Sequence, residues 1–209
     1  MPARPRTNTR GRTITDPIAD DFNRASLGAN WASHLGNASI VSNAHWGPSA
    51  FSGIHVTSWD GSTLPAADQF AEATVASGVD AQMQYQVYVR RRSSDTARYG
   101  WHYNFEASPS PQWEIKYDGV AAELVRVLDT DPASAPAAGS RMRIEVRGTG
   151  ASITINGYHN GILICSVEEI HADRITVNGP PGLVSRAFVG QTLTYPSPVW
   201  TDFAAGTLI

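Results

Sequence analysis

The stretch 81-AQMQYQVYVR-90 alternates between two sets of side chains, one of them apolar throughout. Successive side chains of an extended chain point to opposite faces of a sheet, so this pattern predicts a strand with one face in a core. The set predicted to face the core is Met83, Tyr85, Val87 and Val89. The set predicted to face the other way is Gln82, Gln84, Gln86, Tyr88 and Arg90.

Segments on both sides of this stretch repeat its two-residue period. Residues 98–105 place four aromatic rings on one face, and residues 141–147 do the same with three aliphatic side chains. Turn signals such as Asp118-Gly119 and the glycine-bounded residues 157–161 separate the segments. Further strands are predicted at residues 68–77, 112–117, 122–128, 152–156, 162–167, 182–189 and 201–204. Because no amphipathic helix exceeds two turns, we predict an all-β, two-sheet antiparallel jelly-roll sandwich.

Composition favours one folded domain. The chain has 209 residues, 42% hydrophobic and 17% charged, against roughly 25% charged in an average globular domain. We expect an extended basic arm over residues 1–17 and a single jelly-roll domain over residues 18–209. The lone cysteine, Cys165, lies in an apolar run, which predicts a buried, inert thiol and excludes an intrachain disulfide.

The net charge of −3 is unevenly distributed. Arg4, Arg6, Arg10 and Arg12 precede the first acidic residue, Asp16. Two interpretations remain open: a solvated terminus, or an arm that docks on an acidic protein neighbour. Because the rest of the chain is acidic, we expect no nucleic-acid partner. The first arginines are followed by no apolar stretch, and no segment approaches about 18 apolar residues, so we expect neither a secretory signal nor membrane insertion.

The order of several short motifs resembles a known family. Residues 20–25 (DDFNRA), Leu27-Gly28 and Trp31 resemble the "DxFxR…LG…W" opening of concanavalin A-like (laminin-G-like) lectin and glucanase jelly rolls. Asp202-Phe203 resembles the closing strand, which pairs beside the first. Other matching segments are residues 69–75, 87–91 and 139–161, so the likeness spans about residues 20–205.

This resemblance carries implications for location and partners. Stand-alone domains of this kind, in short chains without signal peptides, resemble minor tail or capsid-decoration proteins of phages of actinobacteria. The resemblance therefore implies a virion protein made in the host cytoplasm. Its expected partners are other virion proteins and further copies of the chain, with a cell-surface glycan as a candidate ligand.

The motifs of catalysis are missing. A glycosidase needs two facing carboxylates, roughly 5–5.5 Å apart for retention and 6.5–9.5 Å apart for inversion. Glucanases of the resembled family carry them on one strand, and this sequence has no such run. Glu106 and Glu114 could meet across a hairpin as an atypical pair. Since no metal-binding histidine spacing, nucleophile elbow or P-loop is present either, we predict that the protein is not an enzyme.

The predicted polar face of residues 81–117 offers the groups that bind sugars. Amides, an aromatic ring and a few charges hydrogen-bond sugar hydroxyls and stack on a pyranose ring. The candidate carbohydrate-binding residues are Gln86, Tyr88, Arg90, His102, Asn104 and Glu114. The alternative is that this face is simply the solvated side of the sandwich.

A structural calcium ion is a second candidate, with no other cofactor expected. If the two ends of the chain pair, Asp20, Asp21 and Asn23 approach Asp202, and such oxygen ligands suit calcium. The alternative is that these side chains cap turns.

The leading functional hypothesis is a non-enzymatic structural or adhesion protein of a phage particle that displays a jelly-roll domain and binds cell-surface carbohydrate. A free-standing carbohydrate-binding module is the first alternative. A glycoside hydrolase with an atypical carboxylate pair is the second.

Overall fold

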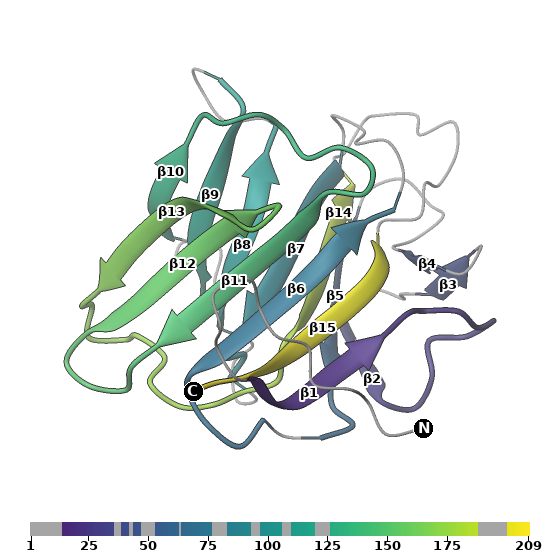
Figure 1. Cartoon of the computed structure of the whole chain (residues 1–209), viewed down its shortest axis with the longest axis horizontal. Helices are drawn as coiled ribbons and strands as arrows, with labels where there is room; N and C mark the ends of the chain where they lie inside the picture. Colours follow the sequence, from purple (N-terminus) through teal and green to yellow (C-terminus); the bar gives the residue numbers. More distant parts are fainter. Residues whose placement is uncertain are drawn as a thin grey trace.

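The protein is a two-layered β-sandwich (Figure 1). The computed structural model describes residues 14–35, 39–41, 44–46, 53–62, 64–76, 83–92, 97–105, 110–119, 126–187 and 200–209. Its strands are β1 (Ile14–Asp20), β2 (Trp31–Leu35), β3 (Ser39–Val41), β4 (Ala44–Trp46), β5 (Gly53–Trp59), β6 (Gln69–Val75), β7 (Met83–Val89), β8 (Arg98–Asn104), β9 (Gln112–Asp118), β10 (Arg126–Asp131), β11 (Arg141–Arg147), β12 (Ile153–His159), β13 (Ile162–Glu169), β14 (Gly182–Ala187) and β15 (Trp200–Leu208). Among these described residues, no helix is long and apolar enough to cross a membrane.

The strands form two antiparallel sheets that lie face to face. The eight-stranded sheet has the order β13-β12-β11-β6-β15-β4-β3, and β1 pairs with β15 beside this path. The seven-stranded sheet has the order β10-β9-β8-β7-β14-β5-β2. Chain neighbours are often not sheet neighbours, because connections cross between the layers (Figure 1). The prediction of an all-β jelly-roll sandwich is confirmed.

The alternating segments supply the interior as predicted. Tyr85, Val87 and Val89 are buried in one hydrophobic core with Ile144 and Val146 of the opposite sheet. Burial of apolar surface stabilises the fold by about 25 cal/mol per Å², and aromatic rings contribute the largest areas. Cys165 is also buried, and burial raises the pKa of its thiol, as expected of an inert cysteine.

The two sheets approach each other closely at Gly157. The indole of Trp101 from β8 lies against this glycine of β12, and a Cβ added there would sit 2.4 Å from a ring carbon. Trp101 also stacks on Trp113 of β9, with ring centroids 4.8 Å apart. A residue without a side chain is therefore required at position 157, because the large indole occupies the space that a Cβ would take.

Several strand boundaries differ from those predicted, and two of the differences are informative. β12 continues to His159, so the expected turn over residues 157–161 shrinks to Asn160 and Gly161, whose φ angles of 51° and 80° suit a tight hairpin turn. At the other end, β1 begins at Ile14, opposite Leu208, and takes in residues 14–17 that were assigned to the arm. The four arginines of the predicted arm lie outside the described residues.

The two ends of the chain pair as the family resemblance implied. β15 runs between β6 and β1, with Phe203 opposite Ala73 on one side and Asp20 on the other. The closing strand therefore holds the first strand in place, and residues 21–30 then cross from the eight-stranded sheet to β2 of the other sheet.

Replacing Gly157 with Ala is expected to lower the free energy of unfolding by about 2 kcal/mol, because the new methyl group overpacks the Trp101 site. Gly150→Ala is the matched control, since nothing lies within 4 Å of a Cβ at that position. Urea unfolding of the two variants measures the difference. Equal stability of both would contradict the close approach of the sheets.

Candidate functional site

The face predicted to bind sugar is covered. Tyr88 is 0% exposed, His102 and Glu114 are each 2% exposed, and Gln86 is 5% exposed. The alternation places these four side chains on the outer face of the seven-stranded sheet as predicted. The prediction that they are open to a ligand is wrong, and only Asn104 keeps partial exposure.

Two of these side chains, Tyr88 and Gln86, are buried because each lies flat across a glycine of a neighbouring strand. Tyr88 reaches over Gly182 of β14, and its hydroxyl donates to the carbonyl of Thr57 on β5 at 2.6 Å. Gln86 reaches over Gly100 of β8 and donates to Asp118 on β9 at 2.9 Å. A Cβ at either glycine would overlap these side chains. We call this arrangement of side chains on the outer face of the seven-stranded sheet the polar layer.

Glu114 is the most heavily hydrogen-bonded member of the polar layer. Its Oε2 lies 3.0 Å from His102 Nε2 and 3.1 Å from Lys116 Nζ. Its Oε1 accepts from the amides of Asn104 at 3.0 Å and Gln112 at 3.1 Å. Burial raises the pKa of Glu114, but the hydrogen bonds from His102, Gln112 and Asn104 outweigh it and hold the pKa well below its usual range.

The protonation of this pair bears on catalysis. Burial lowers the pKa of His102 by more than contact with Glu114 raises it, so the imidazole is neutral at neutral pH. Glu114 is ionised there, and a general acid must instead carry a proton at working pH. Glu114 therefore fits a structural role, and Glu106, the other half of the atypical pair, lies outside the described residues.

Arg90 is a further correction. It has a left-handed backbone, with φ of 52°, so its side chain leaves the face that strict alternation assigns to it. The guanidinium donates to the carbonyls of Ala67 at 2.7 Å, Gly148 at 2.7 Å and Ile175 at 2.8 Å, and the residue is fully buried. Burial lowers the pKa of Arg90 to about 10. Arg90 therefore links residues of separate loops through these hydrogen bonds, and its guanidinium is not accessible to a sugar.

Two of the predicted calcium ligands, Asp20 and Asp21, are used for other bonds. Both oxygens of Asp20 bind the guanidinium of Arg24, at 2.6 and 2.5 Å, and they also accept from the indole of Trp31 and the backbone of Phe22. Asp21 accepts from the backbone of Asn23 at 3.0 Å. Within the described residues no three Asp, Glu, His or Cys side chains form a group that could hold a metal ion. Since Arg24 supplies the positive charge at Asp20, these residues do not fit a calcium ion.

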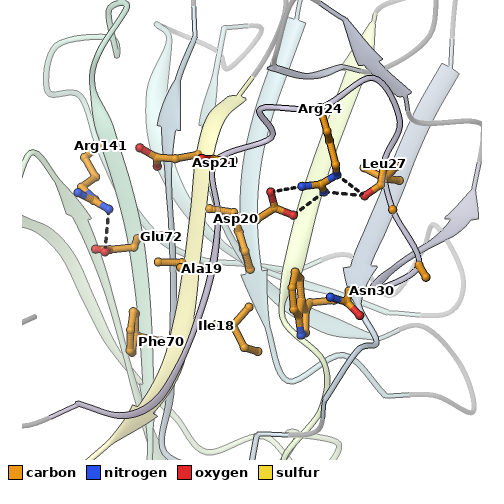
Figure 2. Close-up of a pocket in the computed structure, with 16 residues that line it drawn as sticks. Ile18, Ala19, Asp20, Asp21, Arg24, Leu27, Asn30, Phe70, Glu72 and Arg141 are labelled. Atoms are coloured by element: carbon orange, nitrogen blue, oxygen red, sulfur yellow. Dashed lines mark hydrogen bonds and ion pairs between the residues drawn. The ribbon is translucent and has the colours of Figure 1, made fainter. Parts of the chain in front are cut away.

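A depression of about 980 Å³ lies around β1 and the segment that follows it. Figure 2 shows Arg141, Glu72 and Phe70 on one side of Ile18, Ala19 and Asp20, with Arg24, Leu27 and Asn30 on the other. Small residues, Ala19 and Ala204, lie opposite each other across β1 and β15. Their short side chains leave the space that larger neighbours surround.

The depression contains both satisfied and open polar groups. Glu72 is held by Arg141 at 2.9 Å and Arg143 at 3.3 Å, and Arg24 is held by Asp20. Asp21 and Asn30 are exposed, and Oδ1 of Asp202 is buried without a hydrogen-bond donor among the described residues. The partly buried ring of Trp59 completes the lining and packs edge-on against Trp31, 5.7 Å away.

Sequence reasoning identified part of this site for a different reason. The sequence predicts Asp21 and Asp202 as calcium ligands, whereas in the structure both line the depression. Trp59 and Asn30 were missed, because each ends or precedes a strand whose alternation is weak. The only sequence signal near them is the "LG…W" opening, which marks the loop without indicating what it lines.

The chain was compared with known proteins. No protein-family model matches it, and neither does any curated protein. Among solved structures, the carbohydrate recognition domain of Emp47p is 9% identical with a TM-score of 0.65, over 97% of this chain and 99% of that one. The apo Crh5 transglycosylase is 12% identical with a TM-score of 0.57, over 93% and 85%. The CBM2 module of the evolved Dit of Lactobacillus casei BL23 phage J-1 is 11% identical with a TM-score of 0.55, over 91% and 94%.

These likenesses establish the fold as a lectin-like jelly-roll sandwich. At such low identities they do not transfer a residue or a reaction, because one fold hosts many functions.

Asp20→Asn is expected to lower the free energy of unfolding by about 2 kcal/mol at pH 7, because the hydrogen bonds to a charged carboxylate are lost. Burial raises the pKa of Asp20, but the bonds from Arg24, Trp31 and Phe22 lower it below its usual value. The stabilisation of the fold by ionised Asp20 is therefore complete above the pKa of this group in the unfolded chain, about 4. It is lost as the pH falls through the lower pKa that Asp20 has in the folded protein. Urea unfolding at pH 7 and pH 3 measures it, and the variant should lose less stability on acidification than the wild type.

The same measurement tests the calcium interpretation. Stability of the wild type is expected to be equal in millimolar calcium and in EDTA. If calcium instead raised the stability of the wild type, and Asp20→Asn abolished this increase, the pairing of Asp20 with Arg24 would not be its main role.

Proposed function

We propose that this protein is a non-enzymatic carbohydrate-binding domain, and that its glycan lies in the depression around β1. The observation that carries this proposal is the contrast between two surfaces. The side chains of the polar layer are buried against one another and leave that face closed, whereas the depression presents the exposed side chains of Asp21 and Asn30 beside an aromatic ring.

The chemistry of the depression suits a sugar. Carboxylate oxygens of Asp21 and Asp202 accept hydrogen bonds from hydroxyl groups, and the amide of Asn30 both donates and accepts. The ring of Trp59 offers an apolar surface for a pyranose face. The volume of about 980 Å³ is at the upper end of ordinary ligand sites, which extend to about 1,000 Å³, and leaves room for more than one sugar unit.

Three carboxyl groups have a charge state that excludes them as the acid of glycoside cleavage. Hydrogen bonds from Arg126 and His171 lower the pKa of Asp173, and the pKa values of Asp20 and Glu114 are lowered as well. All three are ionised at neutral pH and cannot act as the protonated acid that glycoside cleavage needs. The likeness to Crh5 concerns the fold.

We place this binding activity on a phage particle, in a minor tail or capsid-decoration protein that contacts cell-surface carbohydrate. Two observations support this placement. One of the solved structures with this fold is a module of a phage evolved Dit. The chain also carries four arginines before β1 in the sequence, whose positive charges suit an acidic virion neighbour.

The binding proposal predicts that the wild type retains glycans on an array of bacterial cell-surface polysaccharides. Asp21→Asn/Asp202→Asn, which removes two acceptor charges, is expected to weaken the best ligand at least tenfold, or about 1.4 kcal/mol. Trp59→Ala is expected to weaken it as strongly through loss of ring stacking. Isothermal titration calorimetry measures both.

Thr154→Ala is the control, because this residue is exposed on β12 away from the residues that line the depression. Unchanged affinity in the two site variants, or no glycan bound by the wild type, would contradict the proposal.

The placement on a virion predicts that the arm and the fold are separable. Deleting residues 1–12 is expected to leave the melting temperature within about 2 °C, because β1 begins at Ile14, while incorporation into purified particles is lost. Particles assembled with a tagged copy of each form, followed by immunoblotting, measure incorporation. Incorporation of the truncated form at the full level would exclude an anchoring role for the arginines.

A further inference from the structure

The depression around β1 is longer than a single sugar ring. Figure 2 shows Arg141 and Asn30 at its opposite sides, with Ala19 between them. On the eight-stranded sheet, β15 and β6 separate β1 from β11, which begins at Arg141. Neighbouring strands lie about 4.8 Å apart, so these three spacings span about 14 Å. Trp59 belongs to the other sheet and extends the lining further, so only several linked sugar units fill the depression.

The middle of the depression has a low floor. Ala19 of β1 lies opposite Ala204 of β15, and Ala204 lies opposite Glu72 of β6. Ala73 and Ala205 are buried in the core, so their chain neighbours Glu72 and Ala204 face outward from the sheet. Ala19 is exposed and Ala204 is partly exposed. A chain of sugar units therefore has room to lie across these two alanines from one side of the depression to the other.

The side of the depression away from Trp59 carries an accessible ion pair. Nη2 of Arg141 lies 2.9 Å from Oε1 of Glu72, and the two side chains are 36% and 17% exposed. A guanidinium has five N–H groups, and within the described residues this one pairs only with Glu72, so N–H groups remain for a ligand. Because the two charges cancel, the pair suits the hydroxyl groups of a neutral sugar, which both donate and accept.

Both extremes of the depression reach solvent. Gly28, Ala29 and Asn30 are exposed at one extreme, and Arg141 is partly exposed at the other. A bound chain can therefore continue beyond the lining residues in either direction. A site for a chain terminus would instead enclose the last sugar unit and its extra hydroxyl group.

We propose that Arg141 and Glu72 form a second sugar subsite, and that the depression binds an internal stretch of a polysaccharide chain laid across Ala19 and Ala204. One unit stacks on Trp59, and a unit further along the same chain meets the ion pair. A chain that occupies one subsite is held at a high effective concentration near the other, so the two weak contacts reinforce each other. The inference rests on the proposed carbohydrate-binding function and specifies that the ligand is a polymer.

Calorimetry with fragments of two and six sugar units tests the second subsite. The fragments are prepared from the array polysaccharide that the wild type retains most tightly. A six-unit fragment offers five overlapping two-unit stretches, so a single subsite would gain no more than about fivefold in affinity. The wild type is expected to bind the six-unit fragment at least thirtyfold more tightly than the two-unit fragment, because only the longer one reaches both subsites.

Two variants are expected to reduce this length preference to about fivefold or less. Arg141→Met removes the donors of the second subsite, and its melting temperature should stay within about 3 °C because exposed ion pairs contribute little to stability. Ala19→Leu raises the exposed floor between the subsites and tests the path of the chain without changing the ion pair. Arg147→Met is the matched control, since Arg147 lies on the same strand and pairs with Glu145 at 3.4 Å but does not line the depression.

The end of the polysaccharide gives an independent readout. Reduction of the terminal sugar of an eight-unit fragment to its alditol is expected to leave the affinity unchanged, because the chain end lies outside the depression. A loss of tenfold or more would show recognition of the chain terminus and would overturn the inference.

The outcomes separate this inference from the binding proposal. If the wild type binds neither fragment, the carbohydrate proposal fails, and the second subsite with it. If both fragments bind but the wild type prefers the longer one no more than fivefold, the second subsite alone fails. An undiminished preference in Arg141→Met and Ala19→Leu would overturn it in the same way.

Discussion

The buried carboxylate of Glu114 is the group on which the outer face of the seven-stranded sheet depends. A buried carboxylate needs compensating groups, and here two amides hydrogen-bond to Oε1 while His102 and Lys116 lie 3.0 and 3.1 Å from Oε2. Tyr88 and Gln86 extend the same layer by lying across Gly182 and Gly100. A ligand is thereby excluded from the centre of this face, and the exposed polar groups lie instead in the depression around β1 of the other sheet.

The sequence alone predicts the features of this structure that follow from the two-residue period of a strand. Alternation placed Tyr85, Trp101 and Ile144 in the core, because the period of a strand decides the face of each side chain. It could not predict whether the outer face is covered. That depends on pairs far apart in the chain, such as Tyr88 with Gly182, and on one left-handed residue, Arg90, that breaks the period.

The candidate site, like the fold, could be predicted only in part from the sequence. Asp20, Asp21 and Asp202 could be brought together from the sequence because the two ends of the chain pair, but their chemistry could not be assigned. The i, i+4 partner of Asp20 is Arg24, and this guanidinium takes the place expected for a metal. Trp59 and Asn30 lie at strand ends, where no periodic signal exists. The fold is shared by a recognition domain, a transglycosylase and a phage module. The function therefore has to be inferred from the residues at the strand ends and not from the fold.

The most direct test of this account is a map of where a neutral oligosaccharide contacts the protein, measured as changes in amide and indole chemical shifts on titration of the labelled chain. The account predicts that the largest changes occur at Asp21, Asn30, Asp202 and the indole of Trp59. Changes concentrated instead at Gln86, His102 and Glu114 would show that the polar layer opens to the ligand, and would contradict the central claim.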